Sequence, residues 1–306
     1  MRLSITHETT YSYKTPVESS HHLAHLTPPS NATQTVLEHR LDIAPAPSDL
    51  DRSERMDFWG NRVTQWYQSQ NHHHLRVWAQ TLIDTRALDA VDSVVNCGQA
   101  SEDLKNSLQF GNASPLQWTY PSHHVPRHPE FNLMAYADLA PERPLVEAAI
   151  ALMQRLHQTM TYDSSSTEVD TPALSAWQAR RGVCQDFAHI LLAGLRQRGQ
   201  AACYVSGYLL TQAPEGRSRL IGADASHAWV AIRVPGLESH PSSGWLHLDP
   251  TNARHGWGSP GSDYVILAQG RDYADVSPLR GVLRGGDLTA PQVRVSVLPV
   301  LSLIHI

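Results

Sequence analysis

Apolar and polar residues alternate in four stretches of the first 85 residues, and this alternation constrains the fold more than any other feature of the chain. The stretches are LSITHETTYSY, TQTVLEHRLDIAP, DFWGNRVTQWYQ and LRVWAQTLIDT. Each is rich in β-branched and aromatic residues with a period near two, and Pro, Asn, Asp and Gly separate them, which is typical of antiparallel strands. Residues 1–85 are therefore predicted to form a small antiparallel β-rich domain.

The pattern changes in the rest of the chain. Residues 86–140 contain several prolines and polar clusters and are predicted to be a connecting segment packed on the surface. Residues 141–160 carry apolar residues at helical spacing, and a short second helix leads to a third that begins at Cys184. Strand patterns follow, so residues 141–300 are predicted to form an α+β core. Residues 301–306 receive no assignment.

Composition narrows the range of functions. The 306 residues are 41% hydrophobic and 17% charged, as in an ordinary globular protein. A formal net charge of -5 without a basic run argues against a nucleic-acid partner. The N-terminus has no apolar signal region and no apolar stretch is long enough for a membrane span, so we expect no membrane partner and a cytoplasmic location. The three widely spaced cysteines argue against a disulfide framework.

One of these cysteines stands at the start of the third predicted helix. In CQDFAHILLAGLRQRG, apolar residues recur at helical spacing from Phe187 to Leu195, and Gly199 is a natural helix end. Cys184 then lies in the first turn, where unpaired backbone N–H groups and the positive end of the helix dipole stabilise a thiolate. This segment alone fits a nucleophile and a buried structural cysteine equally well.

A thiolate nucleophile needs a histidine partner and a third group that orients the histidine. In SHAWVAIRV the alternate aliphatic residues are expected to face the core, which puts His227 on the opposite face. In GWLHLDP the two leucines take the core side, which puts Asp249 on the opposite face. If both aliphatic sets share one core, His227 and Asp249 can be neighbours across paired strands. The alternative is a surface histidine and an aspartate that forms a turn before Pro250.

Three segments carry a family resemblance. RRGVCQDFAHILLAGLRQRG, ADASHAWVAI and GWLHLDPTN, in this order, resemble the active-site segments of the transglutaminase-like superfamily, in the bacterial group whose core follows a β-rich N-terminal region. TYSY and DFWGN resemble that N-terminal region, and GRDYADVSPLRG resembles the C-terminal segment, so the resemblance covers most of the chain. It implies a papain-like core with Cys184 as nucleophile, His227 as general acid and base, and Asp249 as the group that orients the histidine.

Three further residues are weaker candidates. Gln178 lies six residues before Cys184, the spacing at which papain-like peptidases place an oxyanion-hole glutamine. The alternative for Gln178 is an exposed helix residue. Trp177 and Trp229 can wall the cleft, and core packing explains each of them at least as well.

The resemblance implies a reaction at the amide carbonyl of a peptide or protein substrate. Attack by the thiolate leaves a thioester, which water converts to an acid and an amine converts to a new amide. The sequence has no obvious calcium loop or regulatory segment, which favours hydrolysis by a cysteine protease or amidase over acyl transfer. This chemistry requires no cofactor. The alternative class is a non-catalytic binding or scaffold protein that retains the triad.

The remaining motifs predict no further site. The HHH run at 72–74 directs adjacent side chains in different directions, and no CxxC or HExxH accompanies it, so no metal is expected. LRGGDL lacks the preceding strand and the GK[ST] of a phosphate-binding loop. The RDYAD segment at 271–275 can border a substrate cleft or form a structural ion pair and turn.

Overall fold

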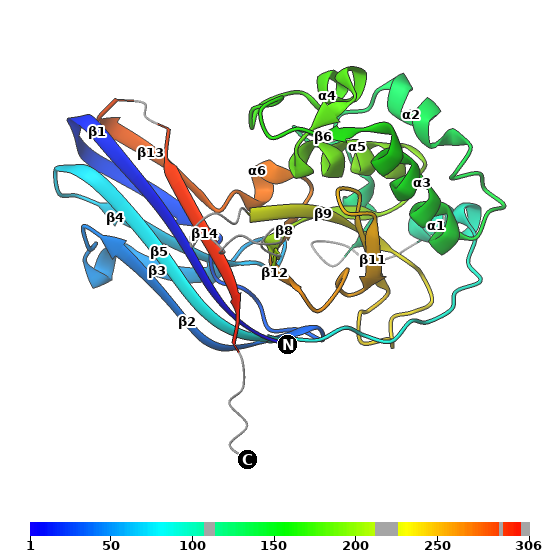
Figure 1. Ribbon diagram of the computed structural model, residues 1–306, viewed down its shortest axis with the longest axis horizontal. Coiled ribbons are helices and arrows are strands. Elements are labelled where there is room, and N and C mark those ends of the chain that lie inside the picture. Colours follow the sequence, from blue (N-terminus) through cyan, green and yellow to red (C-terminus); the bar gives the residue numbers. More distant parts are fainter. Residues whose placement is uncertain (107–113, 212–225, 288–289, 301–306) are drawn as a thin grey trace, which may run out of the picture.

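The computed structural model describes residues 1–106, 114–211, 226–287 and 290–300. Figure 1 shows two bodies side by side, one built from a curved β-sheet and one in which helices cover a second sheet. The fold is α+β, with an antiparallel β-rich N-terminal region before a core in which helices pack on a second sheet, in agreement with the prediction.

The first sheet is organised around its longest strand. Its order is β2-β5-β1-β4-β3, and β13 and β14 also pair with β1. The first half of β1 pairs with β5 and β14, the second half pairs with β4 and β13, and the register shifts between Ser12 and Val17. The strands are β1 (Arg2–Ala24), β2 (Gln34–Ala44), β3 (Arg52–Met56), β4 (Arg62–Gln68), β5 (His72–Thr85), β13 (Leu279–Gly285) and β14 (Gln292–Pro299); a short 3-10 helix, η1 (Asp49–Asp51), precedes β3.

The last two strands correct the predicted domain division. The prediction assigns residues 141–300 to one core, but β13 pairs with β1 from Ala24 opposite Leu279, and β14 pairs with β1 from Leu3 opposite Pro299. Each half of β1 has only one partner among the N-terminal strands, so its other edge would expose unpaired backbone groups. The final strands cover these edges and belong to the first sheet.

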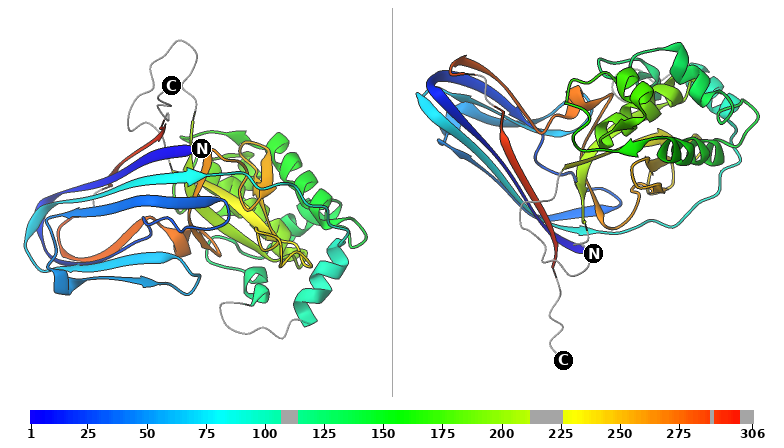
Figure 2. Two further views of the ribbon diagram at one scale, coloured as in Figure 1. Left: turned by 90° about the horizontal axis from the view of Figure 1, so that it is seen from below. Right: turned by 45° about the horizontal axis from the view of Figure 1, so that its top comes forward.

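The second body surrounds the helix that begins at Cys184. Its sheet has the order β11-β10-β9-β8-β12 with antiparallel neighbours. Helix α5 packs on one face of this sheet, and α2, α3 and α4 pack against α5 (Figure 2). The elements are α2 (Pro129–Tyr136), α3 (Leu145–Thr159), α4 (Ala173–Ala179), α5 (Cys184–Gln197), β8 (Ala202–Leu209), β9 (Ser226–Arg233), β10 (Trp245–Asp249), β11 (Arg254–Trp257) and β12 (Tyr264–Gly270).

The segment at 86–140, predicted as a surface connection, contributes helices to this body. Besides α2 it forms α1 (Cys97–Asn106) and the 3-10 helix η3 (Pro115–Thr119). Phe131 is fully buried in the core beneath α5. Prolines suggested a loop here, but Pro129 stands in the first helical turn, where a missing N–H costs no intrahelical bond.

The two bodies share buried contacts. Tyr208 of β8 packs within the apolar cluster of the first sheet, together with two residues of β12, Val265 and Leu267. Gln34 of β2 also bridges the bodies through its amide, which donates to the Ile266 carbonyl across 2.9 Å and accepts from the Ile266 N–H across 2.8 Å. These bonds satisfy a strand edge that would otherwise be buried without partners.

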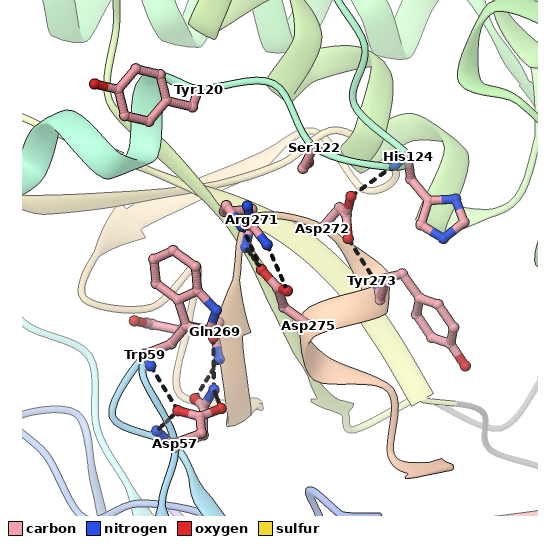
Figure 3. A network of polar contacts seen from close by, with 12 residues as sticks. Asp57, Trp59, Tyr120, Ser122, His124, Gln269, Arg271, Asp272, Tyr273 and Asp275 are labelled. Atoms are coloured by element: carbon pink, nitrogen blue, oxygen red, sulfur yellow. Dashed lines mark hydrogen bonds and ion pairs between the residues drawn. The ribbon is translucent and has the colours of Figure 1, made fainter. Parts of the chain in front are cut away.

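The DFWGN segment forms the turn between β3 and β4 and is hydrogen-bonded to the second sheet (Figure 3). Asp57 Oδ1 accepts the backbone N–H groups of Trp59 and Asn61, each across 2.8 Å. The Asn61 amide in turn donates to the Gln269 carbonyl and accepts from the Gln269 N–H, each across 2.8 Å. Gly60 has φ +83°, in the left-handed region that favours glycine.

The RDYAD segment forms a structural cap. Asp272 caps the short helix α6 (Tyr273–Val276), and its Oδ2 accepts the backbone N–H of His124 across 2.8 Å (Figure 3). Arg271 pairs with Asp275, with Nε 2.9 Å from Oδ2. These contacts support the ion pair and turn, the alternative to a border of the substrate cleft.

Candidate active site

Cys184 is the first residue of α5 and is partly exposed. Asp186 secures this helix start, because its Oδ2 accepts the Val183 N–H across 2.8 Å and the Thr167 hydroxyl across 2.6 Å. A Cβ on Gly182 would stand 2.7 Å from the Asp186 side chain, so only glycine fits here without a shift. The local sequence thus fixes the helix start and the position of the thiol.

His227 and Asp249 meet at one end of the paired strands β9 and β10. Nε2 of His227 lies 2.7 Å from Oδ2 of Asp249. The strand register places Leu248 opposite Val230 on the face toward α5, and the two polar side chains lie on the other face. This is the arrangement that the strand alternation predicts. The other face is not open to solvent, since a second apolar cluster covers much of it.

Asp249 is fully buried and its carboxylate accepts several hydrogen bonds. The backbone N–H groups of Thr251 and Asn252 bind Oδ1 across 2.9 and 3.2 Å. The Asn252 amide and the Tyr264 hydroxyl bind Oδ2 across 2.8 and 2.7 Å. Burial raises the pKa of Asp249, but its hydrogen bonds outweigh burial and hold the pKa below its ordinary value. Asp249 is therefore an ionised partner for His227.

The thiol of Cys184 lies beside the same histidine and acts on its pKa. Because Nε2 of His227 faces Asp249, Nδ1 is the ring nitrogen left for the sulfur. Burial lowers the pKa of His227, but hydrogen bonds with Asp249 and Cys184 and their charges outweigh burial and raise it to about 10. An imidazolium at neutral pH is the partner that a thiolate requires.

Two further residues around Asp249 were not predicted from the sequence. Asn252 lies three residues after Asp249 in the turn of DPTN, a spacing at which an amide commonly bonds back to a carboxylate. Tyr264 comes from β12, at the far edge of the sheet order from β10, so local spacing gives no clue to it.

Tyr162 also lies beside the thiol. It ends β6 (Thr161–Tyr162), which pairs in parallel with β7 (Arg181–Gly182) directly before α5. The side chain is 53% exposed, and burial of the rest together with the nearby Cys184 raises the pKa of Tyr162. This neighbour could not be predicted from the sequence, because its position depends on the pairing of two very short strands.

The contacts of Gln178 and Trp177 give no support to a role at the thiol. Gln178 is exposed, and its Nε2 donates to Oε1 of Glu130 across 2.8 Å. Trp177 is buried in the core, with the Arg180 guanidinium 3.4 Å from its ring centroid. The exposed-helix alternative for Gln178 and the packing alternative for Trp177 describe these positions.

Trp229 is adjacent to the histidine but is part of the core. It is fully buried, and its ring centroid lies 5.9 Å from that of His227 in a stacked arrangement. Its Nε1 donates to Nδ1 of His247 across 2.8 Å. The indole thus supports the His227 ring from within the protein.

Other kinds of site find no support in the described part of the chain. The three histidines at 72–74 have separate partners, the carbonyls of Gln70 and Tyr13 and the Ser12 hydroxyl. Over the described ranges, no three His, Cys, Asp or Glu side chains gather in a group that could hold a metal ion. The same ranges contain no helix of the length and apolarity needed to cross a membrane. The predicted cytoplasmic location stays a prediction.

Two family models match the chain. Residues 3–84 match the bacterial transglutaminase-like N-terminal region, and residues 135–250 match the transglutaminase-like superfamily core. The second match includes Cys184, His227 and Asp249.

Whole-length relatives occur in mycobacteria. An uncharacterized protein of Mycobacterium tuberculosis (strain ATCC 25618 / H37Rv) is 36% identical over 301 residues, 97% of this chain and 93% of that protein. An uncharacterized protein of Mycobacterium leprae (strain TN) is 30% identical over 300 residues, 97% of this chain and 98% of that protein.

A solved structure shares the fold. A protein from Cytophaga hutchinsonii, provisionally named a cysteine protease, superposes with a TM-score of 0.70 at 19% identity, covering 98% of this chain and 91% of that chain. At this identity the likeness establishes the architecture of both bodies and leaves the reaction open.

Proposed function

Because the chain belongs to the transglutaminase-like superfamily, we propose that it is a thiol enzyme that cleaves a carboxamide or peptide bond through a thioester on Cys184. The observation that carries the proposal is the alignment of Cys184, His227 and the buried Asp249, in which Cys184 acts on the pKa of His227 and Nε2 of His227 lies 2.7 Å from the carboxylate. The proposed substrate is a peptide or protein that presents an amide carbonyl.

In the first half-reaction the Cys184 thiolate attacks the carbonyl carbon. The new S–C bond pushes an electron pair onto the carbonyl oxygen, and backbone N–H groups at the start of α5 stabilise this oxyanion. The C=O bond then reforms and the C–N bond breaks, while His227 gives its Nδ1 proton to the leaving nitrogen. The amine departs, and a thioester on Cys184 and a neutral His227 remain.

The second half-reaction reverses these roles. The neutral His227 takes a proton from water, whose oxygen attacks the thioester carbon and expels the Cys184 thiolate. Asp249 stabilises the imidazolium that returns and stays ionised throughout. Hydrolysis is the proposed outcome because Cys184 is partly exposed, so water can reach the thioester. An amine that replaced the water would yield a new amide by the same steps.

Alkylation by iodoacetamide tests the thiolate pair without a known substrate. The rate at Cys184 is followed at pH 6 by mass spectrometry of its peptide in wild type, His227→Ala and Asp249→Asn. We expect roughly a tenfold or larger loss in both variants, because the thiolate loses its imidazolium or the imidazolium its carboxylate. The exposed His74 of the first sheet provides the control His74→Ala, which should keep the wild-type rate.

The other two cysteines cannot serve as the reference for the reactivity of Cys184. Cys97 and Cys203 are buried and react slowly whatever the state of Cys184. Equal Cys184 rates in wild type and His227→Ala would overturn the proposal and favour a binding or scaffold protein that retains an idle triad.

The acyl acceptor needs a separate test. p-Nitrophenyl acetate can acetylate the thiol and release p-nitrophenol, and the decay of the acetyl-enzyme is then followed with and without Nα-acetyl-lysine, whose side-chain amine is free. Decay in water alone at an unchanged rate supports hydrolysis. Faster decay with Nα,Nε-diacetyl-lysine as product would instead assign the protein to acyl transfer.

A further inference from the structure

Three hydrogen-bond donors converge on one oxygen of Asp249. His227 Nε2, the Tyr264 hydroxyl and the Asn252 amide lie 2.7, 2.7 and 2.8 Å from Oδ2. The Asn252 amide nitrogen is also 3.4 Å from the ring nitrogen of His227. The other oxygen, Oδ1, is held by two backbone N–H groups. The histidine therefore shares its acceptor atom with two neutral side chains.

Tyr264 is firmly held in this position. Its side chain is 2% exposed and packs edge-on against Trp229 with ring centroids 5.4 Å apart. On its other side the Arg254 guanidinium lies 4.7 Å from the ring centroid. Arg254 is fixed by two bonds of 2.6 and 2.7 Å to the Asp263 carboxylate. Rotation of the hydroxyl away from Asp249 would require this packing to open.

Donors that share an acceptor oxygen compete for its negative charge. Each bond to Oδ2 disperses charge that would otherwise attract the His227 imidazolium. With fewer competitors, the carboxylate holds the imidazolium proton more tightly, and the histidine becomes a weaker acid. A general acid that must protonate a leaving amine works best when it is not held too strongly in its charged form.

We propose that Tyr264 is a positioning residue that acts through Asp249, where its hydroxyl fixes the carboxylate and competes with His227 for Oδ2, so that His227 stays acidic enough to protonate a leaving amine. Asn252 performs the same task from the exposed side of the site. This inference rests on the proposed thiol-enzyme function, since it assigns the setting of proton donation within that site.

The titratable groups around His227 come from four elements. Cys184 faces it from α5 and Asp249 from β10, and Tyr264 of β12 lies 6.0 Å away between ring centroids. The ion pair of Arg254 and Asp263 stands behind Tyr264. Substitution of Tyr264 by Phe leaves all of these charged groups in place and removes only the hydroxyl.

The test is a titration of His227 by NMR of 13C-labelled histidine in the full chain. The resonance is assigned by its loss in His227→Ala. In wild type it should titrate near pH 10. In Tyr264→Phe and in Asn252→Ala the midpoint should move upward by about 0.5–1 pH unit, since each variant removes one competing donor. A merely structural role for Tyr264 would not produce this upward shift.

Tyr208 provides a matched control. It is also a buried tyrosine, and its hydroxyl bonds to Nδ1 of His7 across 2.9 Å at the junction of the two bodies. Tyr208→Phe should therefore leave the His227 midpoint unchanged. If Tyr264→Phe does not fold, Asn252→Ala still decides, because Asn252 is exposed and donates to the same oxygen.

The outcomes separate the two proposals. An unchanged or lowered midpoint in both Tyr264→Phe and Asn252→Ala would overturn the role assigned to Tyr264, even where iodoacetamide labelling shows an active thiolate pair. Equal rates of Cys184 alkylation in wild type and His227→Ala would instead overturn the thiol-enzyme function. An upward shift in the two variants, with Tyr208→Phe unchanged, supports the inference.

Discussion

The indole Nε1 of Trp229 donates to Nδ1 of His247 across 2.8 Å, and both side chains are buried. The bond requires a lone pair on Nδ1, so His247 is neutral in the folded protein. Protonation of His247 would break this contact and leave a charge without a partner in the core.

Acid should destabilise the protein through this and similar histidines. Burial lowers the pKa of His7 and His22 to about 4 and that of His189 and His247 to about 3. Above about pH 6.5 these rings are neutral in both states, whereas below it the unfolded chain binds protons that the folded one refuses. The free energy of unfolding should therefore fall steadily from pH 6.5 to 4.

Urea unfolding at pH 5, 6 and 7 checks this, with His247→Gln as the informative variant. Gln keeps an acceptor for the indole and removes one titrating group, so the slope should become shallower by about 1.4 kcal/mol per pH unit. An identical slope in wild type and His247→Gln would contradict the prediction.

Alkaline pH should remove a stabilising interaction at the active site. Because folding raises the pKa of His227 to about 10, protonated His227 adds to the free energy of unfolding. This stabilisation is complete below about pH 6.5 and is lost as the pH rises through 10. The unfolding free energy of wild type should therefore fall between pH 7 and 10 more steeply than that of His227→Ala. Parallel curves from urea titrations would show that the ring gains no proton affinity on folding.

Gly182→Ala should disturb the start of the nucleophile helix. The new Cβ would stand 2.7 Å from Asp186, and moving that side chain breaks its bond to the Val183 N–H. We expect a loss of about 1–3 kcal/mol in unfolding free energy and slower alkylation of Cys184. Gly98→Ala in α1 is the control, because its nearest contacts are a milder 3.2 Å and lie outside α5. Unchanged alkylation in Gly182→Ala would mean that the helix start tolerates the shift.

Asn61→Ala should weaken the junction between the two bodies. It removes the Asn61 partners of the Gln269 backbone, whose N–H and C=O would lose these bonds at a partly buried site. The expected loss of unfolding free energy is about 2–4 kcal/mol. Asn132→Ala, which removes a single long contact of 3.4 Å with Arg198, should cost far less. Similar losses in both variants would argue against a special role for the DFWGN turn.

Gln178→Ala should leave the chemistry at Cys184 intact. The Gln178 amide bonds to Glu130 and not to the site, so acetylation by p-nitrophenyl acetate should keep a rate within about twofold of wild type. Loss of an oxyanion donor would instead slow this step by about 10²–10³. A loss of that size would return Gln178 to the oxyanion hole.

Local alternation was enough to predict the His227–Asp249 contact. Strand parity has only two outcomes, and the aliphatic residues of β9 and β10 fix which one applies. The position of Cys184 was equally accessible, because the helical pattern begins at that residue. These features depend on residues within a few positions of one another.

Apart from Asn252, the features that were not predicted from the sequence depend on contacts between distant segments. Tyr264 lies on β12, at the end of the sheet order away from β10, and still reaches Asp249. Gln178 bonds to Glu130 of α2, a helix that was not predicted because prolines in residues 86–140 suggested a loop. Alternation predicts that β13 and β14 are strands but cannot say which strand they join. Their attachment to β1 follows from the open edges of that strand, which appear only in three dimensions.

The pairing of Leu3 with Pro299 has a consequence for biosynthesis. Among the described strands β1 leaves the ribosome first, yet two of the strands that flank it are the last of them to be made. The second body is made between these strands and can fold before the first sheet is complete. A nascent or truncated chain that stops after β12 therefore exposes bare edges along both halves of β1, where pairing with another chain is a hazard.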